Sequence, residues 1–136
     1  MKMVVDSSIL LAWVLDEGSV EADAVVGLLD RATGLVPSVW PLEFANALVM
    51  AERRQRISAA EAFRAREIVM CLDLRVVPDH PPRIMSEIRM LARTHRLSVY
   101  DASYLDLALR EGVPLASLDA ELVAAAEKCG VARVQV

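Results

Sequence analysis

Cysteine and histidine are scarce in this chain of 136 residues, which contains two of each. Cys71 and Cys129 lie far apart and form no CxxC pair, so we expect two reduced thiols on helices and no disulfide framework. His80 and His95 do not have the spacing of zinc ligands. The sequence therefore argues against a disulfide-stabilised domain and against a zinc site.

Long apolar runs are also missing, although 55% of the residues are hydrophobic. No run approaches the ~20 residues that a membrane-spanning helix needs. The apolar start is interrupted at Asp6 and no cleavage-site pattern follows, so we expect no signal peptide. Neither GxxxxGK nor GxGxxG occurs, which argues against the common nucleotide-binding loops. The length predicts one domain over residues 1–136, and we expect a cytoplasmic protein without a membrane partner.

The chain also lacks a net positive charge. Its 19 acidic residues outnumber its 15 basic ones and give a formal net charge of −4. An acidic chain is, as a whole, a poor match for the phosphates of nucleic acids. The basic residues are nevertheless almost all arginines, whose planar guanidinium groups bind phosphate through paired hydrogen bonds. They cluster at Arg53, Arg54 and Arg56, at Arg64 and Arg66, and at Arg89, Arg93 and Arg96. Each cluster is also typical of a solvated helix face.

Apolar runs and capping residues predict strands that alternate with helices. Strands are expected over residues 2–5, 34–37, 74–77, 113–117 and 131–136. Helices are expected over residues 8–14, 19–31, 38–56, 58–72, 83–96, 100–110 and 119–129. Ser38 is the expected cap of the third helix, and Ser58 with Glu61 forms a capping box. This alternation favours an α/β fold in which helices cover both faces of a parallel sheet.

Acidic side chains follow two of the predicted strands at the points where the strands end. Asp6 comes directly after the first strand, and Asp119 comes just after the strand of residues 113–117. Glu43 and Asp101 stand near the starts of two strongly apolar helices. Because the binding crevice of an open parallel sheet lies beyond the carboxyl ends of its strands, we expect these four carboxylates to converge.

Four converging carboxylates repel one another, and each raises the pKa of its neighbours. No lysine lies near any of the four segments to neutralise them. A divalent metal ion would do so, and an all-oxygen ligand set suits Mg²⁺ or Mn²⁺. The sequence therefore predicts a Mg²⁺ site, with Mn²⁺ able to substitute, held by Asp6, Glu43, Asp101 and Asp119.

Simpler roles remain open for each acid when it is taken alone. Asp6 and Asp119 could be helix N-caps, and Asp101 could be a first-turn acid that complements a helix dipole. Glu43 could be an ordinary surface residue. Asp106 follows Asp101 by five residues and should point well away from it on a helix, which leaves an auxiliary metal ligand or a dimer-surface residue as its alternatives.

The four acidic segments together resemble the PIN-domain nuclease family, and in particular the VapC-type toxins of type II toxin–antitoxin pairs. The matching segments are Val4-Val5-Asp6-Ser7-Ser8, Leu42-Glu43-Phe44-Ala45-Asn46-Ala47-Leu48, Tyr100-Asp101-Ala102-Ser103-Tyr104-Leu105 and Leu115-Ala116-Ser117-Leu118-Asp119. Their order and spacing and the total length all match, so the resemblance covers essentially the whole chain. Ser117 stands where the family usually has threonine, and it keeps the hydroxyl.

The resemblance implies a PIN-like three-layer sandwich with a central parallel sheet of about five strands. It implies that the four acids are catalytic and bind the metal, and that Ser7, Ser8 and Ser117 contact the acids or the substrate. The implied activity is that of a Mg²⁺-dependent endoribonuclease, in which water activated by the metal hydrolyses an RNA phosphodiester to a 5′-phosphate and a 3′-hydroxyl. The implied partners are a second copy of the chain and a small cognate antitoxin that blocks the site.

Two other functions share some of these features. A metal-dependent phosphatase would also use acids at strand ends, but it needs an acid pair or a lysine that this chain lacks, since Ser7 and Ser8 follow Asp6 directly. A catalytically inactive PIN-like RNA-binding or interaction module would use the same acids only as helix caps. A metal titration distinguishes the inactive module from the enzyme. A protein whose acids serve only as helix caps is not stabilised by added metal, whereas a protein with a metal site is.

Overall fold

A single parallel sheet organises the chain, and the computed structural model describes it over residues 1–136. The strand order is β3-β2-β1-β4. The central strand β1 (Lys2–Val5) pairs with β2 (Thr33–Pro37) on one side and with β4 (Leu115–Ala116) on the other. Strand β3 (Leu74–Val77) pairs with the far side of β2. All these pairings are parallel, as the alternation of strands and helices predicts.

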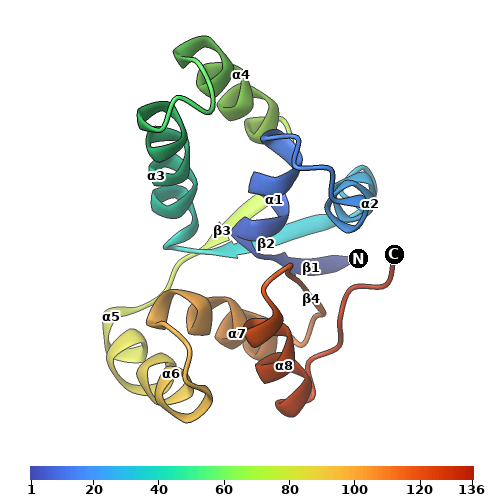
Figure 1. Cartoon of the computed structure of the whole chain (residues 1–136). Coiled ribbons are helices and arrows are strands. Elements are labelled where there is room, and N and C mark those ends of the chain that lie inside the picture. The colour runs from blue at the N-terminus through green and yellow to red at the C-terminus, as the bar shows by residue number, and fades with distance from the viewer.

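Helices cover both faces of the sheet and give the molecule three layers (Figure 1). One face carries α1 (Ser7–Val14), α2 (Val20–Leu28), α3 (Trp40–Arg53) and α4 (Ala59–Met70). The other face carries α5 (Pro81–Arg83), α6 (Arg89–His95), α7 (Val99–Glu111) and α8 (Ala120–Lys128), and the π-helical turn η1 (Ile84–Ile88) joins α5 to α6. The predicted α/β class with helices on both faces is confirmed. No helix is long and apolar enough to cross a membrane.

The central strand fixes the position of the first acid. Met3, Val4 and Val5 have no solvent exposure, because helices pack on both sides of β1. In the sequence, a strand buried on both faces is a continuous run of apolar residues, with no alternation between apolar and polar positions. Full burial of each such side chain contributes roughly 1.5–3 kcal/mol. Asp6, the next residue along the chain, is therefore anchored by the core.

The predicted fifth strand is wrong. Residues 131–136 form only an isolated parallel bridge between Arg133 and Leu115, so the sheet has four strands rather than about five. The amide of Leu115 donates to the carbonyl of Ala132 at 2.9 Å, and the amide of Val134 donates to the carbonyl of Leu115 at 3.1 Å. Because β4 spans only two residues, its outer edge offers too few backbone groups to extend this contact into a ladder.

One predicted helix start is also wrong, whereas another is confirmed in detail. Helix α3 begins at Trp40, and Ser38 does not cap it. Ser38 instead exchanges two hydrogen bonds with Asp79: its amide donates to Asp79 Oδ2 at 3.2 Å, and its Oγ accepts from the Asp79 amide at 2.9 Å. Ser58 and Glu61 form the predicted reciprocal capping box at the start of α4. Ser38 thus ties the end of β2 to the segment after β3.

Candidate active site

Asp6 stands at the carboxyl end of β1 with its side chain almost fully buried, at 5% exposure. Its Oδ2 accepts hydrogen bonds from Ser8 Oγ at 2.6 Å and from Ser117 Oγ at 2.8 Å. Asp6 occupies the N-cap position of α1, but its side chain makes no capping hydrogen bond. Burial raises the pKa of Asp6, and the two serine hydroxyls oppose that rise. The carboxylate is therefore held for a purpose other than capping.

Ser117 joins the first acid to the last. It is completely buried, and its Oγ accepts from the Asp119 amide at 3.0 Å while it donates to Asp6. Ser8 makes a parallel link, because its Oγ accepts from the Leu118 amide at 3.0 Å. The turn after β1 and the turn after β4 are thus joined side by side, which follows from the pairing of the two strands.

Asp119 caps α8, as one of its simpler interpretations predicts. Its Oδ1 accepts from the amides of Glu121 at 2.9 Å and Leu122 at 3.3 Å. Capping uses one carboxylate oxygen, and the side chain remains only half-buried. The cap therefore orients Asp119 without engaging the whole carboxylate.

Glu43 lies in the first turn of α3 and is not an ordinary surface residue. Its Oε1 accepts from Tyr104 Oη at 2.6 Å and from Ser7 Oγ at 3.0 Å, and these two hydroxyls lie 2.7 Å apart. Burial raises the pKa of Tyr104, and the hydrogen bond to Glu43 adds to the rise, so the phenol stays protonated and can donate. Tyr104 was not predicted from the sequence, although its place three residues after Asp101 puts both on adjacent turns of α7.

Asp101 lies in the first turn of α7, which Ser98 caps by accepting from the Asp101 amide at 3.0 Å. Its pKa rises to about 6, first because the side chain is partly buried and then because of the charges of Asp6, Asp119 and Glu43. Asp101 thus lies within electrostatic reach of the other three acids. None of the four carboxylates forms an ion pair with a basic side chain. The four predicted acids therefore lie in one region of the molecule, and no ion pair with a basic side chain offsets their mutual repulsion.

The chemistry of this donor set fits a hard divalent cation. The ligands offered are carboxylate oxygens, flanked by serine and tyrosine hydroxyls, and zinc-type ligands are absent from the set. As they stand, no three Asp, Glu, His or Cys side chains are grouped closely enough to hold an ion among them. A bound Mg²⁺ would therefore have to draw the carboxylates closer, and it would relieve the repulsion that raises the pKa of Asp101.

Asp106 serves neither of its predicted roles. Its carboxylate is 4% exposed and accepts from Arg83 at 2.8 and 3.0 Å and from Arg110 Nε at 2.9 Å. Arg110 Nη2 also donates to Asp79 at 2.9 Å. Asp106 is therefore the buried centre of a part-buried ion-pair network that joins α5 to α7.

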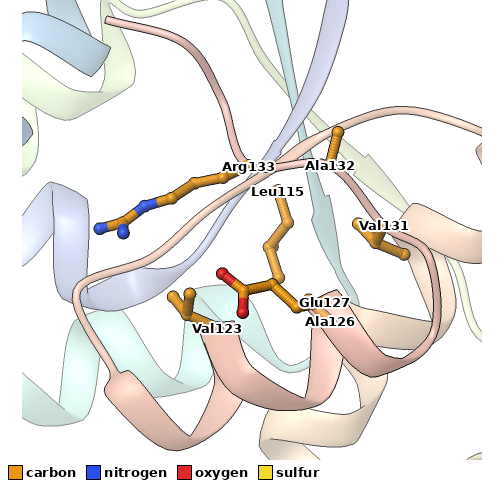
Figure 2. A pocket seen from close by; sticks show the side chains of 7 residues that line it. All are labelled: Leu115, Val123, Ala126, Glu127, Val131, Ala132 and Arg133. Carbon is orange, nitrogen blue, oxygen red and sulfur yellow. The ribbon is translucent and has the colours of Figure 1, made fainter.

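A separate hollow lies between α8 and the C-terminal segment (Figure 2). Its lining is mostly apolar and comprises Leu115, Val123, Ala126, Glu127, Val131, Ala132 and Arg133. None of the four acids or the three serines borders it. The hollow is thus a packing feature beside the isolated bridge and not part of the acidic site.

The fold and the site define a three-layer α/β domain with an acidic cluster at the carboxyl edge of a parallel sheet. Residues 3–128 match the model of the family described as PIN domain. The chain belongs to the PIN domain family, which confirms the resemblance drawn from its four acidic segments.

Solved structures give the same fold. PAE2754 from Pyrobaculum aerophilum is 28% identical, with a TM-score of 0.70 over 92% of this chain and 84% of that chain. VapC20 from Mycobacterium tuberculosis, described as a toxin that cleaves the sarcin–ricin loop, is 16% identical, with a TM-score of 0.65 over 98% of this chain and 99% of that one. VapBC2 from Rickettsia felis, bound to a DNA fragment from its promoter, is 12% identical, with a TM-score of 0.67 over 91% and 92%. No curated protein sequence matched the chain.

Proposed function

We propose that this protein is a Mg²⁺-dependent endoribonuclease and the toxin of a toxin–antitoxin pair. The observation that carries the proposal is the convergence of Asp6, Glu43, Asp101 and Asp119 without a basic partner, as the raised pKa of Asp101 reflects. Membership of the PIN domain family supports it. The fold shared with VapC20, a toxin that cleaves the sarcin–ricin loop, supports RNA as the substrate.

The proposed role of each acid follows from the contacts that hold its side chain. Asp6 and Asp101 would hold the ion directly, and Ser8 and Ser117 fix the orientation of Asp6. Glu43, fixed by Tyr104, orients the attacking water, and Asp119 contributes directly or through water. When bound, Mg²⁺ supplies Lewis-acid activation of that water and stabilises the departing 3′ oxygen.

This division of labour predicts the chemistry of the products. Attack by water on phosphorus leaves a 5′-phosphate and a 3′-hydroxyl, and it makes no use of the RNA 2′-hydroxyl. End-group analysis of the cleaved RNA tests this directly. A cyclic 2′,3′-phosphate would contradict the mechanism, because it requires attack by the 2′ oxygen.

The test of the activity is incubation of partner-free protein with mixed cellular RNA in Mg²⁺, in Mn²⁺ and in EDTA. The Asp6→Asn variant runs beside it, with Asp30→Asn as a control that makes the same charge change at an exposed position. We expect cleavage that requires the metal and disappears only in Asp6→Asn. Equal activity of both variants would remove Asp6 from the site, and cleavage in EDTA would overturn the metal dependence.

The proposal extends to partners and location. A small cognate antitoxin binds the chain and blocks the acidic site, two copies of the chain form a homodimer, and the protein acts in the cytoplasm. The complex of VapBC2 is the structural precedent for a bound partner. Co-expression with the small protein encoded beside this chain tests the pairing, since a true antitoxin must co-purify and suppress cleavage. A neighbour that does neither removes the toxin part of the proposal and leaves the nuclease part intact.

A further inference from the structure

Helix α6 carries two exposed arginines, Arg89 and Arg93, and a third, Arg96, is its C-cap; we name the three the α6 arginines. Arg89 and Arg93 are four residues apart and so lie on one side of the helix, and Arg96 follows directly after its last residue. All three are exposed and none forms an ion pair with an acidic residue. Arg89 has one contact, from Nε to the Met85 carbonyl at 3.1 Å. In a chain with a net charge of −4, these three unpaired guanidinium groups form one of the local concentrations of positive charge on the surface.

Helix α6, which carries the α6 arginines, packs on α7, the helix that carries Asp101. Ile88 and Ala92 are buried together with Ala102, the residue that follows Asp101. Arg96 ends α6 in the left-handed conformation, at a φ of 54°. Ser98 then caps α7 and accepts from the Asp101 amide. The chain therefore passes from the last arginine to Asp101 through one tight, capped turn.

Positive charge continues from α6 across a hollow that lies between α6 and α8. Arg96 and His95 line one side of this hollow, and Lys128 lines the other. Glu121 is the one acidic residue in the lining, and its amide donates to Asp119 Oδ1 at 2.9 Å. The hollow thus lies along α8, the helix that Asp119 caps, and its other charged side chains, Arg96 and Lys128, are basic.

We propose that the α6 arginines and Lys128 bind the phosphates of single-stranded RNA on one side of the cleaved bond. This inference rests on the proposed function and deepens it by naming the surface that holds the substrate. The four carboxylates and the net negative charge repel RNA, so a bound strand needs a local surface of opposite sign. Arginine suits this task, because its guanidinium makes two parallel hydrogen bonds to phosphate.

The experiment measures binding to a short single-stranded RNA of mixed sequence by fluorescence anisotropy over a range of salt concentrations. All proteins carry Asp6→Asn so that cleavage does not intervene. The test variant is Arg89→Gln/Arg93→Gln/Arg96→Gln. The matched control is Arg31→Gln/Arg66→Gln/Arg75→Gln, which makes the same change of net charge at exposed arginines elsewhere. Circular dichroism and thermal unfolding confirm that each protein is folded.

We expect the test variant to bind RNA at least ~10-fold more weakly at about 0.1 M salt, with the control close to the parent. The slope of log affinity against log salt should become shallower by about 2 in the test variant, because each lost contact to single-stranded RNA removes roughly 0.7. In the cleavage-competent background, we expect KM to rise while kcat changes little, because these contacts lie outside the reacting phosphate.

Other outcomes overturn the inference or separate it from the proposed function. Equal losses in the test and control variants would show an effect of net charge alone. Unchanged RNA binding together with weaker capture of a co-purifying protein would assign the α6 arginines to an acidic segment of that partner. A parent protein that binds RNA but never cleaves it would contradict the proposed function while leaving this surface standing. A parent that binds no RNA would contradict both.

Discussion

Asp101 carries part of the electrostatic strain of the site. Its pKa is about 6 in the folded protein, against an ordinary value of 3.8, because of burial and three neighbouring carboxylates. Between these values the folded protein keeps a proton that the unfolded chain has released, so a rising pH favours unfolding. In metal-free protein, the protonation of Asp101 contributes to the free energy of unfolding. We expect this contribution to be complete below pH 3.8 and to be lost as the pH rises to about 6.

Urea unfolding in EDTA across this pH range measures the effect as a difference between the parent and Asp101→Asn. The variant cannot titrate at this position, so its stability should fall less with pH and should exceed that of the parent at neutral pH. Asp23→Asn, at an exposed position on α2, is the control and should follow the parent. Parallel pH profiles for the parent and Asp101→Asn would contradict the proposed repulsion among the four acids.

Tyr104 gives a second prediction at the scale of single residues. Tyr104→Phe keeps the fully buried ring and removes the hydroxyl that donates to Glu43 at 2.6 Å. A hydrogen bond to a charged group is worth ~1.5–3 kcal/mol, so we expect kcat for RNA cleavage to fall roughly 10- to 100-fold if that bond orients Glu43. Tyr100→Phe is the matched control, since Tyr100 is 60% exposed. Equal rates for the two variants would leave the hydroxyl with a structural role only.

The sequence predicts the acids better than it predicts the groups that hold them. Asp6 and Asp119 are recognisable because each follows an apolar strand, and a parallel sheet brings strand ends to one edge. Tyr104 lies 61 residues from its partner Glu43, and nothing local distinguishes it from a residue of the apolar face of α7. Contacts of this kind depend on how helices from opposite faces meet beyond the sheet, which no periodicity encodes.

At the scale of elements, the network around Asp106 joins α5 to α7 and, through Asp79 and Ser38, to the end of β2. Asp106→Ala leaves Arg83 and Arg110 without their shared carboxylate. We expect the free energy of unfolding to fall by about 3 kcal/mol, at the low end for breaking a buried ion pair, because the Arg83 side chain stays 35% exposed.

Urea denaturation of Asp106→Ala beside Asp23→Ala, an exposed aspartate, measures that loss. Removal of Arg83 as well, in Asp106→Ala/Arg83→Met, should cost less than the single substitution, because the unpaired Arg83 charge is then gone and Arg110 keeps its ion pair with Asp79. A single-variant loss no larger than that of the control would mean that the network contributes nothing to the docking of α5 on α7.

The ends of helices and strands show which features the local sequence determines and which depend on tertiary packing. The capping box of Ser58 and Glu61 was predictable because both partners lie within one helical turn. Ser38 has an equally good capping sequence, but its hydroxyl is taken by Asp79, 41 residues further along the chain. The prediction of the last strand was wrong for a similar reason. The apolar residues Val131, Val134 and Val136 favour a strand, but they carry no information about the length of β4, the strand with which it would have to pair.

At the scale of the whole molecule, metal binding and folding stability are linked. A ligand that binds only the folded protein stabilises it by RT ln(1 + [L]/Kd), which is about 2.7 kcal/mol at one hundred times Kd. We expect the Tm to rise with added MgCl₂ or MnCl₂ in the parent and to stay constant in Asp6→Asn. NaCl at matched ionic strength is the control for screening. A parent whose Tm ignores both metals would support the inactive-module alternative.

The link between Asp6 and Ser117 has a consequence for biosynthesis. The two residues lie 111 positions apart, and β1 completes its pairing only when β4 arrives. A ribosome must therefore translate nearly the whole chain before Asp6 meets Ser117, although Asp6 is among the first residues made. Chains terminated before Asp119 lack the last acid of the site, so under the proposed function premature termination yields inert fragments.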